Sequence, residues 1–184
     1  MKPRNIVSVF QGDAAVEKAG MDPDKSFISL KKHEIRNMRS FYEIMSSFGC
    51  RLNDFDGFFV SYSIAQIGKE FDLLRFGTEY VLNIEIKSEL KVAQKEQKIL
   101  KQMRINHYYL KFLGMPIRIF TYVENDGFYK YCIETDNIEK VSPQIIEACM
   151  TGQAVNYSID PDKEFIPSSY LISPFNSTSA FVTG

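Results

Sequence analysis

Three strand-like runs that follow one another between residues 58 and 87 constrain the fold more than any other feature of the sequence. The runs Phe58 to Ile64, Lys69 to Phe76 and Tyr80 to Lys87 are rich in aromatic and branched apolar residues, which strands favour. Gly68 and Gly77 separate the runs, and glycine is typical of turns. We therefore predict a sheet whose first strands are joined by short turns.

A helix is predicted immediately before this sheet. Ser29 is suited to be its N-cap, and the helix is expected to run to about Phe48 and to end at Gly49. Its apolar residues recur at helical spacing and are Met38, Phe41, Tyr42, Met45 and Phe48. The first 26 residues show no sustained period, so we predict that residues 1–28 are an N-terminal extension.

A second helix is predicted from about Lys91 to Leu113. The segment is rich in Lys, Gln, Glu and Leu, which favour helix, and Gly114 and Pro116 suit its end. The elements expected after it are strands at 117–123 and 128–133, a turn at 124–127 between them, and a helix at 143–150. This order predicts an α/β (α+β) fold with a mixed central sheet flanked by helices.

Length and composition indicate one domain of 184 residues, 45% of them hydrophobic. We place its core at residues 29–155, followed by an irregular C-terminal tail or linker at 156–184. No stretch approaches the ~20 apolar residues of a membrane span, so no membrane partner is expected. The three cysteines have no CxxC spacing, which argues against a disulfide framework and predicts a cytoplasmic location.

The net charge of −1 conceals an asymmetry along the chain. Residues 87–113 carry seven basic side chains and two acidic ones, so the rest of the chain is net negative. Lys91, Lys95 and Lys98 form one stripe on the second predicted helix, which continues to Gln102, and Tyr108 lies beyond it. Such a stripe is either a solvated helix face or a surface that binds the phosphates of a nucleic acid.

Acidic residues in the predicted strands are the most informative feature for function. Glu85 and Lys87 point to the same side of their strand, and a hairpin turning at residues 78–79 would place Asp72 directly opposite Glu85. Opposed Cβ atoms are ~5 Å apart, so the two carboxylates require a cation between them. Hard oxygen ligands suit Mg²⁺ or Mn²⁺. A slip of one residue would turn Asp72 to the other face, and solvated charge on an exposed sheet face is the alternative.

Glu34 lies on or beside the apolar stripe of the first predicted helix, four residues before Met38. A carboxylate that turns inward needs a partner or a metal. The alternative is a glutamate at a helix end beside Lys31 and Lys32. No histidine constellation and no Walker-type glycine-rich loop is present in the sequence, so neither histidine-based catalysis nor ATP binding is expected.

Taken together, these residues resemble the PD-(D/E)xK (restriction-endonuclease-like) nuclease superfamily over roughly residues 29–123. The resemblance implies that Glu34 is the helix acid, Asp72 and Glu85 are the metal ligands, Lys87 completes the Glu-x-Lys pair and Gln102 is the helix glutamine. It also implies a restriction-endonuclease-like core and Mg²⁺-dependent phosphodiester hydrolysis. The sequence departs from the family pattern in two ways: Phe71 replaces the proline before Asp72, and Asn106 stands where many relatives have tyrosine.

The block from Gly68 to Gln102 also resembles amino-terminal nuclease domains that precede a helicase in bacterial proteins. We therefore expect a downstream helicase domain in the same polypeptide, in keeping with a chain that reaches Gly184 without a closing pattern. The functional prediction is a Mg²⁺- or Mn²⁺-dependent deoxyribonuclease, with Lys91, Lys95, Lys98 and Tyr108 contacting nucleic acid and DNA favoured over RNA. The alternative is a catalytically inactive nuclease-like module that binds nucleic acid or a protein.

Overall fold

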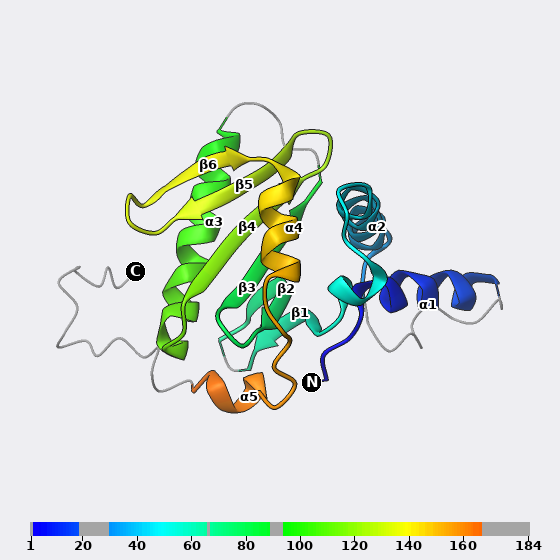
Figure 1. Ribbon diagram of the computed structural model, residues 1–184, viewed down its shortest axis with the longest axis horizontal. Coiled ribbons are helices and arrows are strands. Elements are labelled where there is room, and N and C mark those ends of the chain that lie inside the picture. Colours follow the sequence, from blue (N-terminus) through cyan, green and yellow to red (C-terminus); the bar gives the residue numbers. More distant parts are fainter. Residues whose placement is uncertain (1, 19–29, 66, 89–93, 167–184) are drawn as a thin grey trace, which may run out of the picture.

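A six-stranded mixed sheet forms the centre of the computed structural model, which describes residues 2–18, 30–65, 67–88 and 94–166 (Figure 1). The spatial order of the strands follows the sequence, and β3 and β4 are parallel while all other neighbours are antiparallel. The strands are β1 (Phe58–Ile64), β2 (Lys69–Phe76), β3 (Val81–Lys87), β4 (Ile117–Val123), β5 (Gly127–Cys132) and β6 (Asn137–Val141). A parallel pair needs a crossover, and helix α3 (Lys95–Leu110) provides it.

Helices cover both faces of the sheet, as the sequence predicts (Figure 1). One face packs against α2 (Lys32–Ser47), α1 (Ile6–Lys18) and α4 (Pro143–Thr151), and the other packs against α3. The shorter elements are the 3-10 turns η2 (Leu52–Phe55) and η3 (Lys111–Leu113) and the helix α5 (Pro161–Glu164). The predicted mixed sheet flanked by helices is confirmed.

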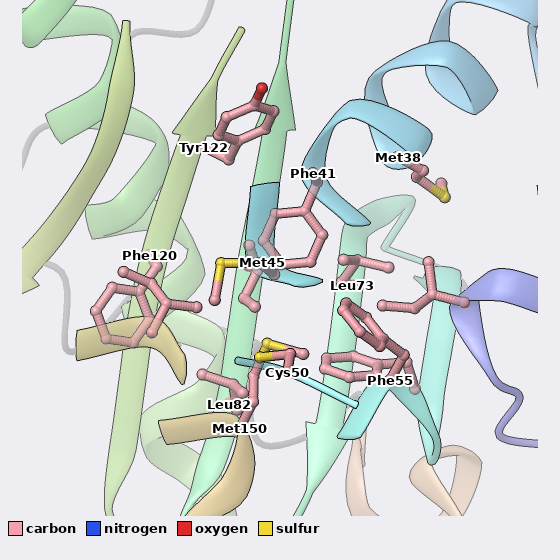
Figure 2. Close-up of a cluster of buried hydrophobic side chains, with 14 of the residues drawn as sticks. Met38, Phe41, Met45, Cys50, Phe55, Leu73, Leu82, Phe120, Tyr122 and Met150 are labelled. Atoms are coloured by element: carbon pink, nitrogen blue, oxygen red, sulfur yellow. The ribbon is translucent and has the colours of Figure 1, made fainter. Parts of the chain in front are cut away.

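Most of the apolar stripe predicted for the first helix becomes the inner face of α2 (Figure 2). Phe48 is the exception, because it follows the helix and is 40% exposed. The inner face of α2 meets side chains of the sheet and of α4 in one cluster of buried residues, each at most 8% exposed. The members labelled in Figure 2 include Met38, Phe41 and Met45 of α2, Leu73, Leu82, Phe120 and Tyr122 of the sheet, and Met150 of α4. Full burial of such a side chain contributes ~1.5–3 kcal/mol, so α2 is firmly fixed on the sheet.

Three elements were not expected from the sequence. The N-terminal extension contains α1, whose residues Ile6, Val7 and Phe10 are buried in the same core as α2. Strand β6 and the single-turn helix α5 were also missed. The predicted N-cap Ser29 and the predicted helix start at Lys91 lie outside the described residues.

The β2–β3 hairpin has the register that the sequence predicts, because Leu73 pairs with Ile84 and Leu74 with Asn83. The side chain of Gln153 holds the turn: its Oε1 accepts hydrogen bonds from the backbone N–H groups of Glu79 (3.1 Å) and Tyr80 (3.0 Å). A Cβ atom at Gly77 would overlap the Gln153 amide, so only glycine permits this approach.

In the described part of the chain, none of the helices combines the length and the apolar character needed to cross a membrane. Cys50, Cys132 and Cys149 are all free thiols.

Candidate active site

The acidic residues of the two hairpin strands meet where the strands stop pairing. Paired residues run from Phe76 and Val81 as far as Leu73 and Ile84. Beyond that point the Asp72 carboxylate accepts a hydrogen bond from the backbone N–H of Ile86 (2.8 Å). The Asp72 side chain thus accepts from a backbone N–H that would otherwise bond to the neighbouring strand. This hydrogen bond fixes Asp72 beside β3.

Lys87 lies between the two carboxylates. Its Nζ is 3.2 Å from Glu85 Oε2 and 3.6 Å from Asp72 Oδ2. The Glu85 side chain is 1% exposed, whereas the side chains of Asp72 and Lys87 are 28% and 31% exposed. The structure therefore brings together the three strand residues that the sequence singles out, with Glu85 at the closed end and the other two at the open end.

Helix α3 closes the site from the opposite side. Gln102 Nε2 lies 3.4 Å from Glu85 Oε2, and Asn106 Nδ2 donates to Glu85 Oε1 at 2.7 Å. Asn83, two residues before Glu85 on β3, accepts from Asn106 at 2.6 Å. Glu85 is thus surrounded by nitrogen donors, which offset the cost of burying a carboxylate.

The electrostatics of the site are dominated by burial and by the pair of carboxylates. Burial, and secondarily the charge of Glu85, raise the pKa of Asp72 to about 7. Burial lowers the pKa of Lys87, but the neighbouring Asp72 and Glu85 outweigh burial and the net pKa is raised. Burial lowers the pKa of Lys69, which lies at the start of β2. Lys87 is therefore a firmly charged cation facing one carboxylate that ionises with difficulty.

A cavity of about 230 Å³ opens beside Asp72 and Lys87, between α2 and the ends of β1, β2 and β3. It is lined by His33, Glu34, Asn37, Met38, Ser61, Glu70, Asp72, Ile86, Lys87 and Ser88. Glu34 also accepts a hydrogen bond from the backbone N–H of Lys31 (2.9 Å). Its side chain is 37% exposed and lies 4.0 Å from Lys31 Nζ. Glu34 is therefore a glutamate at the helix end, as in the alternative, and it also lines the cavity.

Comparison of the chain with protein-family models, curated proteins and solved structures found no match. The case for a function rests on the geometry.

Two buried asparagines of this site were not predicted as site residues. Asn83 shares a strand face with Glu85 and Lys87, and Asn106 stands four residues after Gln102 on α3. Strand alternation and helical spacing are the signals that would have found them. Asn37 is a third buried amide, and it contacts the Ser88 hydroxyl at 2.9 Å on the cavity wall.

The described residues that were predicted to bind nucleic acid differ in their surroundings. Lys91 lies outside the described residues, and Lys98 is exposed on α3. The Nζ of Lys95 forms an ion pair with Asp126 (2.9 Å). Tyr108 packs against the rings of Tyr109 and Phe112, and two residues beyond Asn106 it points away from the acid cluster.

Asp126 gives a test of the ion pair that holds Lys95. Hydrogen bonds from Lys95 and then Tyr129 keep the pKa of Asp126 well below its usual range, and Lys140 pairs with it at 3.0 Å. A depressed folded-state pKa stabilises the protein above the unfolded pKa near 3.9 and loses that effect as pH falls toward the folded pKa. We expect Asp126→Asn to cost about 1 kcal/mol at pH 7.

This cost should shrink steadily below about pH 4, because the unfolded wild-type chain takes up a proton at Asp126 while the folded state still holds the carboxylate ionised. Urea unfolding at pH 7 and pH 3 measures it, with the exposed Glu134→Gln as the matched control. An equal difference between wild type and Asp126→Asn at both pH values would contradict the prediction.

Proposed function

We propose that this chain is a nuclease domain with a restriction-endonuclease-like core, hydrolysing phosphodiester bonds of DNA with Mg²⁺ or Mn²⁺. The observation that carries the proposal is the convergence of Asp72, Glu85 and Lys87 from two adjacent strands, with Asp72 and Lys87 on the wall of one cavity and Glu85 buried behind them. Two carboxylates and a lysine in one partly open site are a suitable set for a divalent cation and a phosphate.

The donor set fits a hard divalent cation. Asp72 and Glu85 supply carboxylate oxygens, the ligands that Mg²⁺ and Mn²⁺ prefer. The raised pKa of Asp72 reflects burial beside a second negative charge, and a cation would relieve that cost. Within the described residues, no group of three or more His, Cys, Asp or Glu side chains could hold a metal ion. Asp72 and Glu85 would therefore hold it together with backbone, amide or water oxygens.

When bound, such a cation polarises a phosphate and lowers the pKa of an attacking water. The protein residues supply the remaining functions. Lys87 places a positive charge beside the reacting phosphate, where it stabilises the developing negative charge and orients the water. Gln102 holds the Oε2 atom of Glu85 on the open side of the site. The exposed basic residues of α3, such as Lys98, attract the DNA backbone.

A second candidate function is nucleic-acid binding without cleavage. It is favoured by the ion pairs that Lys87 already forms with both carboxylates, because these neutralise the acids without a metal. In that case the site would be an internal salt bridge and the basic face of α3 would carry the activity.

Replacing Asp72 by asparagine separates these functions. The wild type is expected to bind Mn²⁺ by calorimetry and to cleave plasmid and single-stranded DNA. Asp72→Asn should lose Mn²⁺ binding and at least ~100-fold of the cleavage rate. The same variant should unfold at a higher urea concentration in EDTA at pH 8, because it removes an ionised carboxylate beside Glu85.

The control is Glu79→Gln, which removes an exposed carboxylate at the tip of the same hairpin. Salt-dependent DNA binding without Mn²⁺ binding by the wild type would support the binding module instead. A wild type that binds no DNA at any salt concentration would contradict both functions.

A further inference from the structure

We propose that Asn83 and Asn106 act as a pair of positioning residues, which commit one oxygen of Glu85 to the protein and leave the other for a cation. The proposal rests on the function proposed above and deepens it. It assigns a role to two buried amides that neither the acid pair nor the lysine requires.

The contacts of this pair are short and shielded from water. Asn106 Nδ2 donates to Asn83 Oδ1 (2.6 Å) and to Glu85 Oε1 (2.7 Å). Asn83 and Asn106 are 0% exposed and Glu85 is 1% exposed. Burial strengthens hydrogen bonds to a charged group, and it makes an unmatched polar atom costly.

A backbone carbonyl fixes the direction of every amide in the network. Asn83 Nδ2 donates to the carbonyl of Leu73 (3.1 Å), and a carbonyl can only accept. The Oδ1 of Asn83 must then face Asn106, whose NH₂ group is thereby turned toward Glu85. The Oδ1 of Asn106 is left to accept from Gln102 Nε2 (3.3 Å).

These contacts give the two carboxylate oxygens of Glu85 different partners. Its Oε1 accepts from Asn106 and faces Asn83 Nδ2 at 3.4 Å, so it is fully engaged within the protein. Its Oε2 faces Lys87 and Gln102 toward the side where Asp72 lies. The Oε2 atom of Glu85 is thus held in a fixed orientation, as a metal ligand needs to be, and a cation bound there would take the place of Lys87.

The chain of contacts also joins the site to the register of the sheet. The carbonyl of Leu73 belongs to the last residue pair of the β2–β3 hairpin, and Asn106 comes from α3, which packs on β4 and β6 (Figure 1). The amides therefore transmit the position of the hairpin to Glu85. A purely structural network would stabilise the core without affecting metal affinity. Measuring stability and metal affinity therefore separates a structural role from a role in positioning Glu85.

The test compares Asn106→Leu, which keeps the side-chain volume and removes the donor, with Asn106→Ser, which keeps a shorter donor. Gln97→Glu, an exposed change on the same helix, is the control. Mn²⁺ affinity is measured by calorimetry, kcat and KM by DNA cleavage, and stability by urea unfolding in EDTA. We expect Asn106→Leu to lose about 10–100-fold in Mn²⁺ affinity and in kcat, with KM for DNA unchanged and a partial recovery in Asn106→Ser.

Each outcome bears on the proposal. Loss of stability with wild-type Mn²⁺ affinity and kcat in the folded variants would make the network merely structural and overturn it. Equal losses in Asn106→Leu and Asn106→Ser would also overturn it, because the donor would then not matter. If Asn106→Leu does not fold, Asn106→Ser decides: wild-type Mn²⁺ affinity overturns the proposal and a several-fold loss supports it. A wild type that neither binds Mn²⁺ nor cleaves DNA overturns the proposed function, and this inference with it.

Discussion

Lys87→Ala is expected to stop DNA cleavage while leaving Mn²⁺ bound at least as tightly as in the wild type. The Nζ atom lies 3.2 Å and 3.6 Å from the two carboxylates that would hold the cation. Its removal leaves Asp72 and Glu85 with no positive group between them, so a divalent cation has less competition. The developing charge on the phosphate loses its lysine, which costs about 10²–10³-fold in kcat.

Asp72→Asn is expected to affect Mn²⁺ binding differently, so comparing it with Lys87→Ala is informative. Asp72→Asn should lose the metal and the activity together, whereas Lys87→Ala should lose the activity alone. Lys163→Ala is the matched control, because its side chain is 82% exposed on α5. Cleavage by Lys87→Ala at the wild-type rate would show that its proposed catalytic role is wrong. Loss of Mn²⁺ binding in Lys87→Ala would make the lysine a structural partner of the acids.

The hairpin that carries Asp72 and Glu85 could be predicted because its signals are local. Strands β1 and β2 begin and end at the predicted residues, since runs of aromatic and branched residues between glycines have few other stable arrangements. The register follows from the position of the turn. What alternation could not predict is the divergence of the strands beyond Leu73 and Ile84, because it depends on a side-chain bond between Asp72 and the Ile86 backbone.

The missed elements derive their stability from distant parts of the chain. Helix α1 contains Gly12 and several β-branched residues, which disfavour helix locally. Its burial against α2, including the contact of the Phe10 and Tyr42 rings at 5.4 Å, compensates for that cost. Strand β6 is a short edge strand whose residues are mostly exposed, so its hydrogen bonds to β5 rather than its own pattern define it.

Strand alternation and helical spacing place Asn83 and Asn106 near the acids, but their roles, and that of Gln153, depend on burial and on contacts that the sequence does not show. Each asparagine has polar neighbours at favourable spacing, but an amide becomes a site residue only when burial excludes water from it. Gln153 contacts a turn more than 70 residues earlier in the chain. Such long-range contacts leave no periodic signal in the sequence.

Arg75→Ala is expected to have the largest effect on stability, about 3–5 kcal/mol. Arg75 lies on β2, is 1% exposed, and among the described residues forms no ion pair with a carboxylate. Its guanidinium donates instead to the carbonyls of Asp54 (2.9 Å) and Met150 (2.7 Å) and stacks 4.8 Å from the centre of the Phe58 ring. Removal leaves two carbonyls without their donor and a cavity beneath the sheet.

The position of these carbonyls explains how a cation is tolerated there. Burial lowers the pKa of Arg75, yet Met150 lies in the last turn of α4, where the helix dipole presents partial negative charge. Arg75 thereby ties β2 to η2 and to the end of α4. Arg118→Ala is the matched control, since that exposed guanidinium contacts the neighbouring Cys149 Sγ at 3.0 Å and its loss should cost no more than about 1 kcal/mol.

Arg75→Met separates the charge from the volume, because methionine fills much of the space without a donor. If packing dominates, Arg75→Met should recover most of the stability lost in Arg75→Ala, since replacing a buried charge by an apolar side chain is often neutral. If the carbonyl bonds dominate, as the two short contacts to Asp54 and Met150 imply, Arg75→Met should remain at least about 2 kcal/mol below the wild type in urea unfolding. An Arg75→Ala variant within about 1 kcal/mol of the wild type would contradict both accounts.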